Sequence, residues 1–97
     1  MKPILFHPAA RAELDEAVGH YAAQRSGLGV ELRAEVESAA VRIQQTPERW
    51  APFTKFTRRF RVRRFPYSVV YVIRPELIVI VAVAHGKRKP GYWQARL

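Results

Sequence analysis

The chain has 97 residues, of which 48% are hydrophobic, and it contains no cysteine. This length supports one modest core, so we expect residues 1–97 to form a single domain. The lack of cysteine excludes disulfides, thiolate catalysis and the usual structural zinc sites, and three scattered histidines do not suggest a metal centre. No apolar run approaches the roughly 20 residues that cross a bilayer, and no signal-peptide core follows Met1. These features predict a cytoplasmic protein without a cofactor or a metal.

The net charge of +9 comes from the second half of the chain. Residues 1–50 hold six Lys/Arg and seven Asp/Glu, whereas residues 51–97 hold eleven Lys/Arg and one glutamate. A field this concentrated attracts polyanions, either nucleic acid or an acidic protein. The alternative is a solvated surface that only keeps the protein soluble. The uneven distribution favours a polyanionic partner.

The first half predicts a short strand followed by a helical hairpin. Residues 3–6 are apolar and fit a strand that joins a later sheet. Pro8 suits the first position of a helix, because its missing N–H would have no partner there. Gly27 and Gly29 end this helix and begin another, which stops before Pro47. Both helices carry apolar stripes with helical spacing, formed by Leu14, Val18, Tyr21 and Ala22 in the first and by Leu28, Leu32, Val36, Ala39 or Ala40, and Ile43 in the second.

The second half predicts three strands after an irregular loop over residues 48–57. In the first of them, Phe60 and Val62 alternate with arginines, which gives the strand one apolar and one cationic face. Residues 67–73 and 77–84 are rich in Val, Ile and Tyr and read as the other two strands. The order β-α-α-β-β-β predicts an α+β fold, an antiparallel sheet with a helical hairpin packed on one face.

Residues 77–84 are apolar on both alternating faces, as expected of a central strand. Two helices can cover only one face of the sheet. Either the C-terminal tail or a partner must cover the other, and we expect a partner, because large exposed apolar patches mark interaction sites.

Several short motifs stand in a fixed order along the chain: Pro47-Glu48-Arg49, the block from Val62 to Tyr67 with Tyr71, Ala82-Val83-Ala84-His85, Lys87-Arg88 and Tyr92-Trp93. Together with the order of elements and the first helix with Leu14, Val18 and Tyr21, they make the whole chain resemble toxins of the RelE/ParE superfamily. The resemblance implies the toxin half of a bacterial type II toxin–antitoxin pair, neutralised by a cognate antitoxin. RelE-like members cleave messenger RNA in the ribosomal A site, and ParE-like members poison DNA gyrase.

Metal-free RNA cleavage needs a base, an acid and cations that stabilise the charged phosphorane. By resemblance to RelE-like enzymes, Arg63 or Arg64 and Arg88 would bind phosphate, and Tyr92 would correspond to their C-terminal tyrosine. His85 is a candidate base or acid near neutral pH, although a histidine at a strand end also often bonds the backbone. Tyr67 and Tyr71 share one strand face, which is typical of core residues rather than of base stacking.

The short Pro90-Gly91 spacing before Tyr92 departs from the RelE pattern. The sequence therefore favours a ParE-like inhibitor of DNA gyrase and replication, with a ribosome-dependent mRNA interferase as the alternative. A non-toxic nucleic-acid-binding module is a third reading that rests on charge alone. We expect the residues that bind the target or its phosphates to be Arg59, Arg61, Lys87, Lys89 and Trp93.

Overall fold

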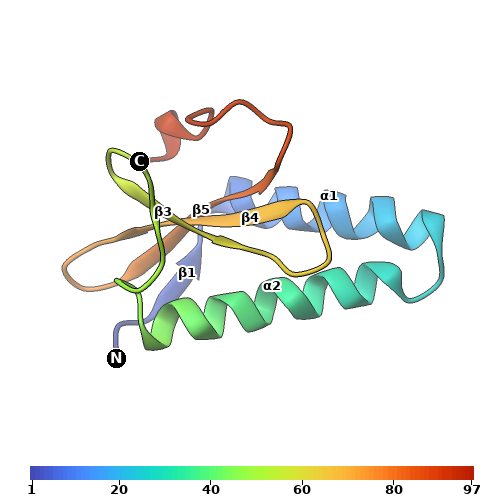
Figure 1. The fold of residues 1–97 in the computed structure, drawn as a ribbon, viewed down its shortest axis with the longest axis horizontal. Helices are drawn as coiled ribbons and strands as arrows, with labels where there is room; N and C mark the ends of the chain where they lie inside the picture. The colour runs from blue at the N-terminus through green and yellow to red at the C-terminus, as the bar shows by residue number, and fades with distance from the viewer.

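The computed structural model describes residues 1–97 as two helices, a five-stranded sheet and a C-terminal 3-10 turn (Figure 1). The two helices lie on one side of the sheet, and the C-terminal segment crosses the other side. The elements are β1 (Ile4–Phe6), α1 (Pro8–Gln24), α2 (Leu28–Gln45), β2 (Pro52–Thr54), β3 (Thr57–Arg61), β4 (Tyr67–Ile73), β5 (Ile78–His85) and the 3-10 helix η1 (Gln94–Arg96). The predicted α+β class and the helical hairpin are confirmed.

The hairpin forms where the sequence predicts it. His7 caps α1, since its Nδ1 accepts the backbone N–H of Ala9, and Pro8 takes the first helical position. Gly27 has φ 84°, a left-handed conformation that favours glycine, and it turns the chain into α2. Neither helix has the length and apolarity that a membrane span would need.

The sheet is mixed rather than fully antiparallel, which refines the prediction. Its strand order is β1-β5-β4-β3-β2, with β1 parallel to β5 and every other pair antiparallel. A parallel pair needs a long crossover, and the chain between the two strands supplies one. The fifth strand, β2, falls in the predicted loop over residues 48–57, and three residues are too few to show a periodicity.

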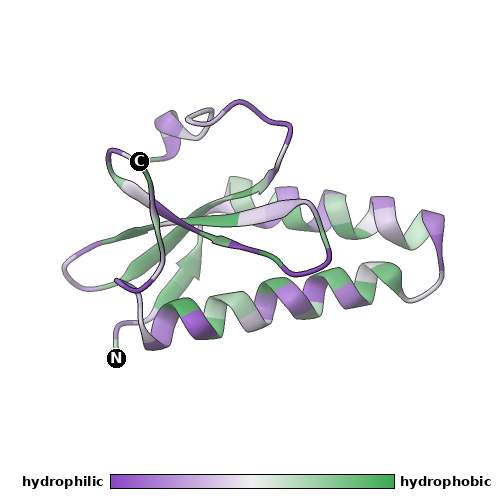
Figure 2. Cartoon of the chain, in the orientation of Figure 1, coloured by the Kyte–Doolittle hydropathy of each residue, from purple (hydrophilic) through white to green (hydrophobic).

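The main core lies between the hairpin and the sheet. The helices contribute a buried apolar stripe, and Val69, Tyr71 and Ile80 face it from β4 and β5. Figure 2 shows the apolar sides of the helices turned toward the sheet. Tyr71 is fully buried and its hydroxyl donates to the Pro47 carbonyl oxygen, so the prediction that it is a core residue is confirmed.

The opposite face of the sheet is covered by the protein's own tail. Trp93 is 1% exposed and packs with Val70, Val81 and Ala84, and Phe53 of β2 joins this second cluster. A shift in the pairing of β4 with β5 at Val70/Tyr71 puts both Val81 and the adjacent Ala82 in this cluster. The expectation that a partner covers this face is therefore corrected: the tail covers it, because Trp93 supplies a large apolar ring.

Candidate functional site

Two arginines of β3 project from the face of the sheet that the tail crosses. Phe60 packs in the main core, so its neighbours Arg59 and Arg61 point the other way, as the alternation predicts. Arg59 pairs with Val70 and Arg61 pairs with Ser68 of β4. The Arg59 guanidinium lies 4.0 Å from the centre of the Phe53 ring, a cation–π contact that holds it against the sheet.

The segment after β5 carries three further cations, of which Arg88 lines a hollow together with Arg59. Lys87, Arg88 and Lys89 follow the strand end, where the Gly86 N–H donates to the Pro66 carbonyl oxygen at 2.7 Å and fixes the start of the loop. The Arg88 guanidinium lies 3.8 Å from the centre of the Tyr92 ring. We call these cations, with Arg59 and Arg61, the basic face: Arg59, Arg61, Lys87, Arg88 and Lys89.

None of the basic-face residues forms an ion pair within the protein; all five ion pairs in the structure involve other cations. A hollow of about 110 Å³ separates Arg59 from Arg88 and is also lined by Ser68, His85 and Trp93. Unpaired guanidinium groups beside a hydroxyl and an imidazole suit an anionic oxygen, such as that of a phosphate or a carboxylate.

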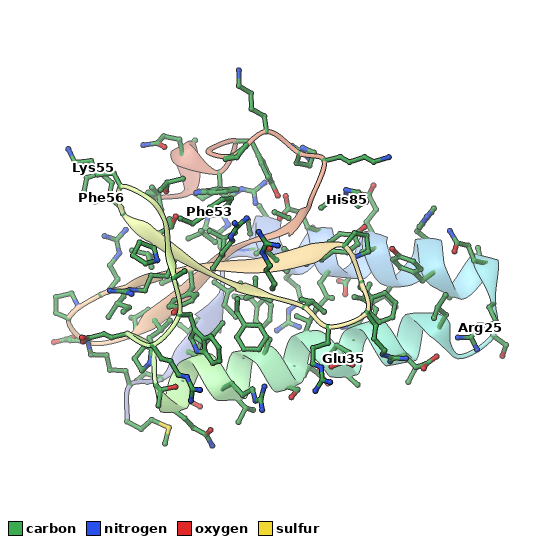
Figure 3. The ribbon with its side chains drawn as sticks, in the orientation of Figure 1. Arg25, Glu35, Phe53, Lys55, Phe56 and His85 are labelled. Carbon is green, nitrogen blue, oxygen red and sulfur yellow. The ribbon has the colours of Figure 1, made fainter.

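His85 lies where the basic face meets α1. Its Nδ1 accepts the Lys87 backbone N–H at 3.0 Å, which leaves the proton of the neutral ring on Nε2. The ring contacts Tyr67 edge to face, with 5.1 Å between ring centres. The predicted backbone hydrogen bond is therefore present, and the ring also lines a second hollow of about 310 Å³ with Glu16, His20 and Tyr92. Figure 3 shows His85 at the opposite end of the sheet from Lys55 and Phe56.

Tyr92 lies under Arg88 in a half-buried position. Burial, and then the Glu13 carboxylate, raise the pKa of the Tyr92 hydroxyl well above its usual value. A tyrosine hydroxyl is protonated at neutral pH in any case, and the raised pKa makes this one a still poorer candidate for a general base than for a hydrogen-bond donor.

Arg64 does not join the basic face. Its backbone has φ 67°, and its guanidinium bonds Glu31 at 3.2 Å and Glu35 at 3.4 Å, both on α2. Glu35 and His85 are labelled in Figure 3, which shows them on different elements, α2 and the end of β5. Arg63 is exposed and forms no ion pair. The structure thus brings His85, Arg88 and Tyr92 together and leaves Arg64 on the helical side.

Trp93 is placed in the second core cluster instead of at a target-binding surface. With 1% of its surface exposed, the ring has almost no area to offer to a target, because it fills the space between the tail and β5. Its indole N–H is buried without a hydrogen-bond partner.

Sequence reasoning missed two residues that shape this site. Phe53 supports Arg59, and Glu13 bonds Arg96 of the tail at 3.0 Å. Phe53 lies in a stretch without periodicity, and Glu13 has the spacing of an ordinary exposed helical residue. Neither residue has a local signal that would predict its contact. No group of three or more His, Cys, Asp or Glu side chains is arranged to hold a metal ion.

The chain is similar to known proteins in both sequence and structure. The family described as "ParE toxin of type II toxin-antitoxin system, parDE" matches residues 4–90. Two Mycobacterium tuberculosis proteins named Toxin ParE2, from strains CDC 1551 / Oshkosh and ATCC 25618 / H37Rv, are each 33% identical over 92 residues, which cover 94% of this chain and 88% of theirs. A solved structure titled "Chromosomal ParDE TA system from P. aeruginosa" superposes with a TM-score of 0.76 at 19% identity, covering 88% of this chain and 96% of that one.

The helical hairpin, the mixed sheet and these relatives place the protein among the RelE/ParE superfamily toxins, as its resemblance implied. Within the superfamily, the chain belongs to the ParE toxin family. It is a toxin of a type II toxin–antitoxin system, and an antitoxin is the partner that this class implies.

Proposed function

We propose that this toxin stops growth by inhibiting DNA gyrase, and so replication, through contacts that the basic face makes. The cations of this face are unpaired within the protein, and Arg59, Arg61 and Arg88 line two hollows that share Arg59. Lys87 and Lys89 flank Arg88 in the chain. A surface of this kind favours association with a polyanion, such as a complex of an enzyme with DNA. Such a target lies in the cytoplasm, which is the location we propose for the toxin.

The single observation that carries the choice of gyrase is the position of Arg64. RNA cleavage in the RelE manner would use a phosphate-binding arginine from this part of the chain together with Arg88 and Tyr92. Here Arg64 bonds Glu31 and Glu35 on α2 instead. A nuclease set that lacks this arginine supports inhibition by binding rather than by cleavage.

Supercoiling of relaxed plasmid by purified DNA gyrase tests this proposal. We expect the toxin to block supercoiling and the Arg59→Ala/Arg61→Ala variant to lose most of this effect. The matched control is Arg25→Ala/Arg42→Ala, which removes the same charge from exposed positions at the C-terminal end of α1 and on α2. Full supercoiling at saturating wild-type toxin would contradict the proposal.

One observation favours the mRNA interferase as a second candidate. Arg59, Ser68, His85 and Arg88 line one hollow, and this set offers cations beside an imidazole without the help of Arg64. Translation of a reporter in a cell-free system, with cleavage in the ribosomal A site mapped, separates the two functions. Cleavage that disappears in His85→Ala would establish the nuclease, and intact message with blocked supercoiling would exclude it.

The antitoxin is tested separately by expression. Induction of the toxin without its antitoxin should arrest growth, and coexpression should restore it. We propose that the antitoxin is acidic, because the toxin carries a net charge of +9. Normal growth on induction of folded toxin would contradict both the gyrase and the interferase functions.

A further inference from the structure

The carboxylate of Glu13 ties α1 to the C-terminal tail. Its Oε1 and Oε2 accept hydrogen bonds from Nη1 and Nη2 of Arg96, both at 3.0 Å. Both side chains are largely buried, with 18% and 19% of their surface exposed. A guanidinium held by two parallel bonds is the most geometrically specific of the arginine–carboxylate pairs, so Arg96 is held in one place and one orientation.

The same pair occupies an edge of the sheet that no strand covers. β1 pairs with β5 only as far as Ile80. Beyond it, the Val83 N–H donates to Oε1 of Glu13 at 3.0 Å, and Nη1 of Arg96 donates to the Val81 carbonyl oxygen at 3.0 Å. The two side chains thus replace the hydrogen bonds of a neighbouring strand, and loss of Glu13 would leave a part-buried N–H and a guanidinium without their partner.

From Arg96 the contacts continue to the basic face. The Tyr92 ring contacts two guanidinium groups, and its centre lies 5.2 Å from that of Arg96 and 3.8 Å from that of Arg88. Arg88 forms no ion pair, so its contact with this ring is what orients its guanidinium. Arg88 therefore depends on a chain of contacts that begins on another element.

We propose that Glu13 is a positioning residue for Arg88, acting through Arg96 and the Tyr92 ring. The inference rests on the function proposed above for the basic face. Glu13 itself touches no target. Its role is to hold the tail so that the Arg88 guanidinium lies over Tyr92 and beside the hollow it shares with Arg59.

Nuclear magnetic resonance of the purified full chain measures the position of the Arg88 side chain relative to the Tyr92 ring. Methylene protons next to a guanidinium stacked on a tyrosine ring are shifted upfield by the ring current. In Glu13→Ala we expect the Arg88 side-chain protons to lose this shift. We also expect about ten times more toxin to be needed for the same growth inhibition, a change that corresponds to one lost contact of ~1.4 kcal/mol. The matched control is Asp15→Ala, which removes another α1 carboxylate paired with an arginine, Arg33 at 2.9 Å, away from the tail.

The outcomes separate positioning from function. A folded Glu13→Ala protein that keeps the Arg88 shift would overturn the proposal. A lost shift with undiminished growth inhibition would support the positioning and overturn its link to the function of the basic face. Loss of the shift in Asp15→Ala as well would also overturn the proposal, because the effect would then be general. If the wild type does not inhibit growth, the function proposed above fails, while the Arg88 shift still decides whether Glu13 positions this side chain.

A second variant guards against misfolding of Glu13→Ala, which circular dichroism would detect. Arg96→Lys keeps the positive charge but cannot make the paired bonds to Glu13. We expect it to fold and to lose the Arg88 shift in part. An unchanged shift in this folded variant would contradict the chain of contacts through Arg96.

Discussion

Nη1 of Arg64 donates to Oε1 of Glu31 at 3.2 Å, which directs this arginine to α2 and away from the basic face. The Glu31 hydrogen bond raises the pKa of the Arg64 guanidinium, as expected of a cation held by a carboxylate. Arg64→Ala should therefore leave growth inhibition unchanged, whereas Arg88→Ala should reduce it strongly. Growth after induction, at matched protein levels, measures both. Equal loss of toxicity in the two variants would show that Arg64 contributes to the target surface.

The Arg64→Ala variant should also keep its stability nearly unchanged. Both ion pairs of Arg64 are at the surface, where water and salt screen them and exposed pairs contribute little. Urea unfolding should give a midpoint close to that of the wild type. A large drop would mean that the loop over residues 62–66 depends on these pairs.

The parts of the fold that the sequence predicts well are those with a local period. The stripes of Leu14 and Leu32 repeat with helical spacing, and the alternation around Phe60 repeats with strand spacing, so both follow from neighbours in the chain. The cationic side of β3 could therefore be predicted before the structure was known.

The remaining features depend on contacts between distant residues. Glu13 and Arg96 are 83 positions apart, and nothing near either residue indicates their pairing. The left-handed backbone of Arg64 breaks the strand pattern in a direction that the sequence does not specify. The sequence could not predict that Trp93 covers β5 for the same reason, because a single large apolar ring in a polar tail forms no repeating pattern.

Trp93 should dominate the stability of the tail. Trp93→Ala removes a fully buried ring and should lower the free energy of unfolding by about 3–5 kcal/mol. Trp93→Phe keeps most of the apolar contact and removes an indole N–H that is buried without a partner. An unpaired buried donor costs about 1–3 kcal/mol, which offsets the lost ring area, so we expect the Phe variant to stay close to the wild type in urea unfolding. Equal loss in both variants would contradict this account.

Tyr71 should make the fold sensitive to alkali. Burial raises the pKa of its hydroxyl from 10.0 to about 12. Between these values the unfolded chain loses the proton and the folded protein keeps it, so the free energy of unfolding falls as pH rises. Below pH 10 this group adds no pH dependence. Tyr71→Phe should flatten the decline between pH 10 and 12 in urea titrations, with Tyr67, whose pKa is also raised by burial, accounting for part of the remaining slope.

At neutral pH, Tyr71→Phe should lower stability by about 1 kcal/mol, because the Pro47 carbonyl oxygen loses its donor. Relative to the wild type, the variant is therefore less stable at neutral pH and recovers relative stability as the pH rises from 10 to 12. An unchanged alkaline slope would show that the hydroxyl ionises as freely in the folded protein as in the unfolded chain.

Two helical glycines should respond oppositely to the same substitution. At Gly29 a Cβ would lie 2.5 Å from the Val18 carbonyl oxygen, so Gly29→Ala forces the helices apart and should cost about 1–3 kcal/mol. At Gly19, in the exposed interior of α1, a Cβ would meet nothing within 4 Å. Gly19→Ala should add about 0.5–1 kcal/mol by limiting the freedom of the unfolded chain. Urea midpoints measure both, and a stabilised Gly29→Ala would show that the hairpin packs less closely than this contact requires.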